Sequence, residues 1–158
     1  MASGAKRGRA LVLGLTLGVA IASCQSQAPV QADLVADAKA VLAAHEDAVK
    51  AADLESIVAN AAEDVVVLVP GAPLIEGRDA VRAFYQQLLA AGSGEFKHEY
   101  SGQEVIGDAV VLHGVARGVM PGPDGEALPF ANNFILVMKK DGAGKMKFWR
   151  VAFAPSAT

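Results

Sequence analysis

Four long strand-like stretches fill the second half of the chain, and they constrain its fold more than any other feature. They span residues 96–106, 109–120, 128–140 and 145–154. Gly107-Asp108 joins the first two and is a two-residue hairpin signal, while Asp141-Gly142-Ala143-Gly144 joins the last two. Strands connected by such short turns pair antiparallel. The sequence therefore predicts an antiparallel meander.

Two helical segments are predicted near the start of the region before this meander. From Asp33 to Val49, apolar residues recur at steps of three and four and form one stripe. Asp53 carries a side chain suited to an N-cap, so we expect a short second helix that ends at Glu63-Asp64.

A strand and a third helix are predicted before the meander begins. The continuous apolar run at residues 65–69 predicts a buried strand, which Pro70-Gly71 ends. A third helix follows Glu76-Gly77-Arg78 and stops at Gly92. Three helices followed by an antiparallel meander predict an α+β fold, in which helices cover the concave face of a curved antiparallel sheet.

The first 24 residues have the pattern of a bacterial lipoprotein signal peptide. A basic segment precedes an apolar run at residues 11–22, which is shorter than the roughly 20 residues that span a membrane. The run ends in Ile21-Ala22-Ser23-Cys24, which resembles the lipobox whose cysteine is lipidated. We expect residues 1–23 to be removed, Cys24 to carry acyl chains, and residues 24–32 to form a polar tether. An ordinary secretory signal with an incidental cysteine is the alternative.

Gln25, the single cysteine and the net charge limit where the protein is expected to be located and which partners it is expected to bind. Gln25 stands where an aspartate would favour the inner membrane, so the resemblance implies an outer-membrane lipoprotein that faces the periplasm. Cys24 is the sole cysteine, which excludes an intramolecular disulfide. Loss of the three basic residues of the signal peptide lowers the formal net charge from −3 to −6. An acidic domain is a poor partner for nucleic acid, so membrane contact is expected through Cys24 alone.

The order of several short motifs between residues 33 and 154 resembles one known family. The motifs are the run at residues 52–58, Glu63-Asp64 before a strand, Pro70-Gly71, Glu76-Gly77-Arg78, Val81, Phe84-Tyr85 and the hairpin at 141–145. Their order is similar to that of the SnoaL-like and ketosteroid-isomerase-like branch of the nuclear transport factor 2-like superfamily. The resemblance implies one domain at residues 33–155 with a cone-shaped α+β fold, a deep apolar pocket and homodimers formed through the outer sheet face.

The catalytic carboxylates of the isomerase have no match in this sequence. The family's base is an aspartate at the end of the first strand, directly before a proline, but here Val69 precedes Pro70. The position of a second acid falls at about Leu136, and a tyrosine of the first helix is replaced by His45. Tyr85 alone matches the pattern. The resemblance therefore does not imply that this chain uses the isomerase mechanism.

His45 is the strongest catalytic candidate. It lies on the apolar stripe of the first helix and so points inward, where an unpaired imidazole costs roughly a few kcal/mol. The resemblance places Tyr85 within reach of it. Histidine is the common general acid–base near neutral pH. The pair is either catalytic or a hydrogen-bonded part of the core.

The strand faces predict the wall of a pocket. If Gly107-Asp108 is a two-residue turn, Ile106 pairs with Ala109, and His98 then shares a face with His113 and Arg117. A one-residue bulge near Gly102 would move His98 to the other face. Alternation along the last two strands adds further wall residues, with ordinary core packing as the alternative. The predicted pocket residues are His113, Arg117, Asn132, Phe134, Trp149 and Phe153.

Two functions remain open from the sequence. The first is binding of a small hydrophobic molecule by a lipid-anchored, periplasm-facing domain that lacks the isomerase carboxylates. The second is an isomerase, dehydratase or cyclase that uses His45 and Tyr85 as an acid–base pair. The histidines show no metal-ligand spacing, so neither a metal nor another cofactor is expected.

Overall fold

The structure is a computed structural model that describes residue 1 and residues 27–92, 94–122 and 124–156. Cys24 and the predicted signal peptide, apart from Met1, lie outside the described residues. Of the helices that the structure describes, none is both long enough and apolar enough to cross a membrane.

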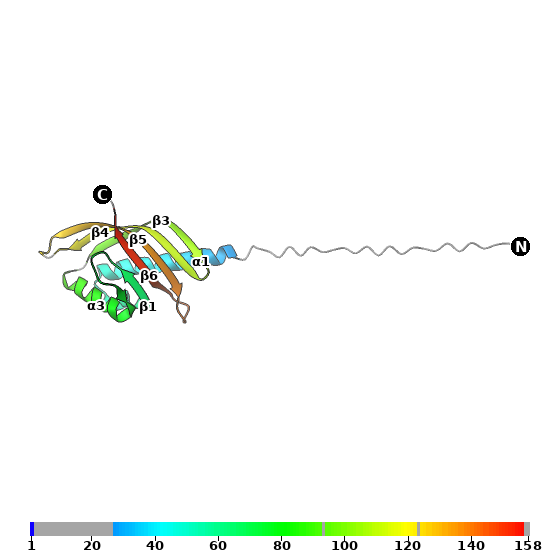
Figure 1. Cartoon of the computed structure of the whole chain (residues 1–158), viewed down its shortest axis with the longest axis horizontal. Helices are drawn as coiled ribbons and strands as arrows, with labels where there is room; N and C mark the ends of the chain where they lie inside the picture. Colours follow the sequence, from blue (N-terminus) through cyan, green and yellow to red (C-terminus); the bar gives the residue numbers. More distant parts are fainter. Residues whose placement is uncertain (2–26, 93, 123, 157–158) are drawn as a thin grey trace.

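The described chain has the predicted α+β organisation, with three helices that all precede the long strands (Figure 1). The elements are α1 (Gln27–Lys50), α2 (Leu54–Ala59), β1 (Ala61–Leu68), β2 (Ile75–Glu76), α3 (Gly77–Ala90), β3 (Glu95–Ile106), β4 (Ala109–Pro121), β5 (Ala127–Lys140) and β6 (Met146–Pro155).

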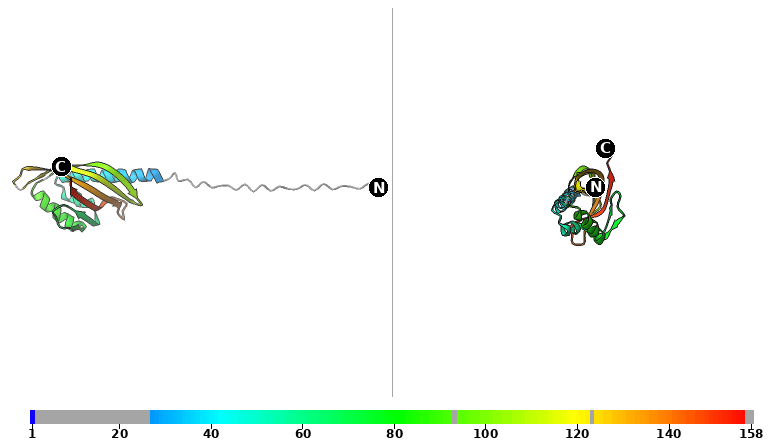
Figure 2. Two further views of the ribbon diagram at one scale, coloured as in Figure 1. Left: turned by 45° about the horizontal axis from the view of Figure 1, so that its top comes forward. Right: turned by 90° about the vertical axis from the view of Figure 1, so that its left-hand side faces the viewer.

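The six strands form one curved sheet in the order β2-β1-β6-β5-β4-β3. The meander β3-β4-β5-β6 is antiparallel as predicted, and Ile106 pairs with Ala109 across the tight turn. The strand that precedes the meander differs from it, because β1 pairs with β6 in parallel. The edge strands β2 and β3 do not pair, so the sheet stays open and curls around the helices (Figure 2).

Two predicted boundaries differ from the structure. Helix α1 begins at Gln27, so most of the predicted polar tether is helical. Pro29 is compatible with this start because a backbone N–H in the first helical turn has no intrahelical partner. Helix α2 begins after its N-cap Asp53, as predicted, but ends at Ala59. The acidic pair Glu63-Asp64 lies within β1, where both side chains are exposed.

The core lies between the concave sheet face and the helices. Leu42 of α1 packs in one buried cluster with Leu112 of β4 and Leu136 of β5, and each of the three is about 1% exposed or less. Burying a leucine side chain contributes roughly 1.5–3 kcal/mol. Helix α1 runs along β3, and α3 packs on β1, so the helices cover the concave face of the sheet.

Two β-bulges decide which side chains of the sheet face the helices. The first is Ser101 in β3. Tyr100 pairs with Gly114 and Gly102 pairs with the adjacent His113, so Ser101 has no partner in β4. The second is Trp149 in β6, since Val137 and Met138 of β5 pair with residues on either side of it. Each bulge reverses the alternation of its strand from that point on.

Candidate functional site

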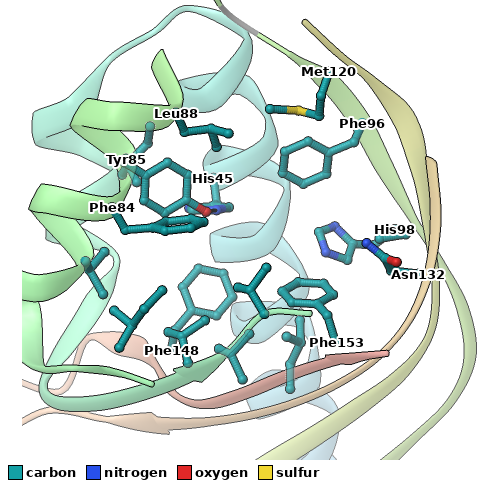
Figure 3. A pocket seen from close by; sticks show the side chains of 18 of the residues that line it. His45, Phe84, Tyr85, Leu88, Phe96, His98, Met120, Asn132, Phe148 and Phe153 are labelled. Atoms are coloured by element: carbon teal, nitrogen blue, oxygen red, sulfur yellow. Dashed lines mark hydrogen bonds between the residues drawn. The ribbon is translucent and has the colours of Figure 1, made fainter. Parts of the chain in front are cut away.

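A cavity of about 350 Å³ lies between the helices and the concave face of the sheet (Figure 3). Most of its lining side chains are aliphatic or aromatic, and they come from α1, α3 and the sheet. Examples are Leu42, Val65, Phe84, Phe96, Phe130 and Val151. Its volume and its apolar wall are typical of small-molecule sites.

Four polar side chains line this cavity among the described residues. They are His45, Tyr85, His98 and Asn132. None of the described lining residues carries a carboxylate, an ammonium or a guanidinium group. The cavity therefore offers a few hydrogen-bonding groups on an otherwise apolar surface.

His45 and Tyr85 form the predicted pair. The His45 Nε2 atom lies 3.0 Å from the Tyr85 hydroxyl oxygen, and the two rings meet edge to face (Figure 3). Helix α1 supplies the histidine, and α3 supplies the tyrosine. Phe148 packs against the His45 ring, with 5.0 Å between the centroids. This contact and the hydrogen bond hold the imidazole in one orientation.

The environment of the pair keeps both groups uncharged. Burial and, to a lesser extent, the neighbouring His98 lower the pKa of His45 to about 4, although Glu46 acts in the opposite direction. Burial raises the pKa of the Tyr85 hydroxyl well above its usual range. The His45 Nδ1 atom is buried and has no hydrogen-bond partner among the described residues. His45 is therefore a neutral imidazole at pH 7.

We expect His45 to make the protein less stable in mild acid. The unfolded chain binds a proton at His45 near pH 6.5 and the folded chain only near pH 4, so stability falls as the pH drops through this window. Between pH 7 and pH 5 this effect amounts to about 2 kcal/mol. Urea unfolding at both pH values should show a smaller loss for His45→Phe. An equal loss in the variant and the wild type would contradict the assignment.

A second polar cluster connects α1 to β3 behind the cavity wall. One carboxylate oxygen of Glu46, Oε1, accepts hydrogen bonds from the backbone N–H of His98 and from its Nδ1, both at 2.9 Å. The other oxygen, Oε2, accepts from Lys97 Nζ at 2.8 Å. The side chains of Glu46 and His98 are 7% and 2% exposed. This cluster fixes the orientation of the His98 ring toward the cavity.

The hydrogen bonds and burial set the protonation states of this cluster. Burial alone would raise the pKa of Glu46, but the hydrogen bonds from Lys97 and His98 outweigh it and leave the pKa below its usual value. Burial lowers the pKa of His98, and its bond to Glu46 only partly offsets this. Glu46 is therefore a carboxylate and His98 a neutral imidazole at pH 7.

The family follows from comparison of the sequence with family models. Residues 41–148 match the model described as SnoaL-like domain. The chain belongs to the SnoaL-like domain family. No curated protein matches the sequence of this SnoaL-like chain.

Solved structures show the same fold as this SnoaL-like domain. A ketosteroid isomerase-like protein from Erwinia carotovora atroseptica SCRI1043 superposes with a TM-score of 0.67 at 19% identity, over 78% of this chain and 96% of that one. A nuclear transport factor 2-like superfamily protein from Salmonella enterica has a TM-score of 0.71 at 12% identity, over 80% and 94%. A candidate dehydratase of the same superfamily from Streptomyces avermitilis has a TM-score of 0.68 at 18% identity, over 80% and 99%.

The two positions at which the resemblance expects an acid are apolar in this SnoaL-like domain. Val69 and Leu136 both line the cavity. They occupy the places at which the resemblance put the two missing acids. Apolar side chains at these positions extend the apolar wall. Among the described residues, no group of three histidine, cysteine or acidic side chains is placed to hold a metal ion.

Two predicted pocket residues lie on the outer face of the sheet instead. The bulge at Ser101 places Lys97, rather than His98, opposite Arg117. Arg117 Nε donates to Glu99 at 3.2 Å on the exposed side. His113 lies on the same face, against Gly102. The prediction that His113 and Arg117 line the pocket is therefore wrong.

The bulge at Trp149 changes the predicted pocket in a similar way. Trp149 faces outward, where its indole N–H donates to Asp64 at 2.8 Å, and Phe148 lines the cavity in its place. Phe134 is buried but lies beside the His98 ring, with 4.8 Å between the centroids, and is not part of the lining.

Asn132 and Phe153 do line the cavity, as predicted. Glu46, by contrast, was not predicted as part of the site. Its sequence signal is weak, because an acidic residue next to His45 in a helix is expected to face solvent. His98 could be assigned only once the bulge in β3 was known.

Proposed function

We propose that this SnoaL-like domain binds a small hydrophobic molecule in its cavity. The observation that carries the proposal is the lining itself, which combines apolar side chains with four uncharged polar groups and no carboxylate among the described residues. A ligand without charge would enter such a site without leaving a buried ion unpaired. The cavity has the volume of about a dozen liquid water molecules, so the ligand is small.

Two neighbouring residues of β4 provide a test of this binding. Met120 lines the cavity, whereas Val119 is 41% exposed and is not part of the lining. We expect the full chain to bind the fluorescent apolar probe 1-N-phenylnaphthylamine at one site. Met120→Asp should weaken this binding by about 10-fold or more, because its carboxylate loses water when the probe enters.

Val119→Asp is the matched control and should leave the affinity for the probe unchanged. Fluorescence titration of the three chains gives the dissociation constants, and circular dichroism confirms that each variant is folded. Equal affinities in Met120→Asp and Val119→Asp would place the probe outside the cavity and contradict the proposal.

The 3.0 Å contact between His45 and Tyr85 supports a second candidate function, an isomerase, dehydratase or cyclase. Tyr85 can take a proton from the ligand while it passes its own to the neutral His45 Nε2, which leaves a ligand anion beside an imidazolium. The reverse transfer to another atom of the ligand restores both side chains. Turnover of lipophilic carbonyl compounds that His45→Phe and Tyr85→Phe both abolish, with probe binding retained, would support it. Absence of turnover across such compounds leaves the binding function alone.

We further propose that Cys24 carries acyl chains and holds the domain at the periplasmic side of the outer membrane. The support is the sequence pattern of residues 1–24 together with Gln25. Helix α1 begins at Gln27, only three residues after Cys24. Three residues extend at most about 11 Å, so the lipid anchor would hold the start of α1 close to the bilayer.

A homodimer is proposed through the outer face of the sheet. Ile135 of β5 is 48% exposed there, and His113 is its partner in β4. Val111 and Val137 pair with each other on the same face. Burial of these side chains against a second copy would remove apolar surface from water. Analytical ultracentrifugation of the full chain tests the dimer.

A further inference from the structure

A row of three residues crosses the sheet at one wall of the cavity. His98 of β3 pairs with Ala116 of β4, and Ala116 pairs with Asn132 of β5. All three line the cavity. The side chain of Ala116 is short, so nothing between the imidazole and the carboxamide separates them from the same part of the cavity. Figure 3 shows both groups on the sheet side, away from His45 and Tyr85.

Glu46 determines which nitrogen of His98 is available in the cavity. A carboxylate only accepts hydrogen bonds, so the nitrogen that lies 2.9 Å from Glu46 Oε1, Nδ1, carries the proton. The neutral ring then has a bare lone pair on Nε2. This assignment of the tautomer follows from the hydrogen-bond network. The backbone N–H of His98 donates to the same oxygen, so Glu46 Oε1 is held beside His98 by two hydrogen bonds.

Two hydrogen-bonding groups on this wall are left without protein partners. Among the described residues, neither His98 Nε2 nor the Asn132 carboxamide makes a hydrogen bond, although both side chains line the cavity. Polar groups inside a protein are nearly always paired with protein, water or ligand. These two lie on either side of Ala116 and so can share one partner.

We infer that His98 and Asn132 form a subsite for a hydroxyl group on an apolar ligand, with Glu46 as the positioning residue of His98. The inference rests on the proposed binding function and names the chemical class of its ligand. A hydroxyl donates its proton to Nε2 and accepts from the Asn132 N–H, so one oxygen satisfies both groups. A ketone or ether offers no proton to Nε2.

Charged ligand groups fit this subsite poorly. A carboxylate would face the Nε2 lone pair, with the Glu46 carboxylate directly behind the ring. An ammonium group would find no carboxylate among the described lining residues. Burial of either ion without a partner is strongly unfavourable. An alcohol or phenol is neutral at pH 7 and avoids both penalties.

Two matched probes test the subsite on the full chain. 2-Naphthol carries the hydroxyl, and 2-methoxynaphthalene has the same ring system without the donor. Isothermal titration calorimetry should give about 3- to 10-fold tighter binding of 2-naphthol, which is the range for one added hydrogen bond. His98→Phe should reduce this ratio to near one while 2-methoxynaphthalene still binds. Asn132→Leu should instead weaken both probes, because the oxygen of each accepts from the Asn132 N–H.

Asn133→Leu is the control, because Asn133 faces outward near Pro155 and should leave the ratio unchanged. Three results would overturn the inference but leave the proposed function standing. They are equal binding of both probes to the wild type, a ratio that survives His98→Phe, and wild-type affinity of Asn132→Leu for both probes. If neither probe binds the wild type, the proposed function fails and the inference fails with it.

The role of Glu46 has its own spectroscopic readout. Nitrogen-15 NMR of the His98 ring should show a protonated Nδ1 and a bare Nε2 in the wild type. Glu46→Gln should shift these signals toward a mixture of tautomers and lower the 2-naphthol preference. A structural role for Glu46 would change neither quantity. A wild-type His98 protonated at Nε2 overturns the inference.

Discussion

Glu46→Ala is expected to lower the free energy of unfolding by about 3 kcal/mol. The substitution leaves two buried donors of His98, the backbone N–H and Nδ1–H, without an acceptor. Each buried donor that loses its partner costs roughly 1–3 kcal/mol. These bonds also connect the C-terminal part of α1 to β3, so their loss loosens the wall that carries His98. Urea unfolding at pH 7 measures the change.

Two further substitutions show whether this stability comes from the buried carboxylate. Glu46→Gln keeps an acceptor oxygen and should lose less stability than Glu46→Ala. Asp47→Ala removes the adjacent acidic residue, which is exposed, and should change the stability little. If Glu46→Ala is no more destabilising than Asp47→Ala, the buried cluster does not stabilise the fold as described.

Cys24→Ala is expected to release the chain completely from the membrane fraction. The acyl chains on Cys24 are the proposed anchor, and their apolar burial contributes about 0.8 kcal/mol for each CH₂ group in the bilayer. Expression in a bacterial host with labelled palmitate should show label in the wild type but none in Cys24→Ala. After cell fractionation, the wild type should sediment with outer membranes, and Cys24→Ala should not.

Gln25→Asp tests the direction of sorting in the same experiment. This variant keeps Cys24 and should therefore remain labelled but move to the inner-membrane fraction. An unlabelled wild type, or a Cys24→Ala chain that still sediments with membranes, would contradict lipid anchoring. In that case residues 1–23 act as an ordinary secretory signal.

The helices and strands could be predicted from the sequence because their signals are local. The apolar stripe from Asp33 to Val49 marks α1, and Gly107-Asp108 marks the β3-β4 turn with the correct Ile106–Ala109 pairing. The parallel pairing of β1 with β6 was not predicted. It joins strands about 85 residues apart, and no local pattern specifies such a contact.

The candidate site could be predicted only in part, because its wall depends on two single-residue bulges. His45 and Tyr85 lie on helices, whose faces follow directly from sequence spacing, and their contact is confirmed. Side chains in a strand change face with every residue, so one inserted position reverses the prediction. With the bulge at Ser101, His98 lies in the cavity wall. With the bulge at Trp149, Phe148 lines the cavity and Trp149 faces outward.

The central claim is that the cavity is the ligand site, and NMR of labelled isoleucine methyl groups tests it most directly. The chain has five isoleucines. Ile57 and Ile75 line the cavity, whereas Ile106 and Ile135 are exposed outside it. With 1-N-phenylnaphthylamine added, we expect nuclear Overhauser contacts from the probe to the Ile57 and Ile75 methyls alone. Contacts to Ile106 or Ile135, with none to the two lining residues at saturation, would contradict the account.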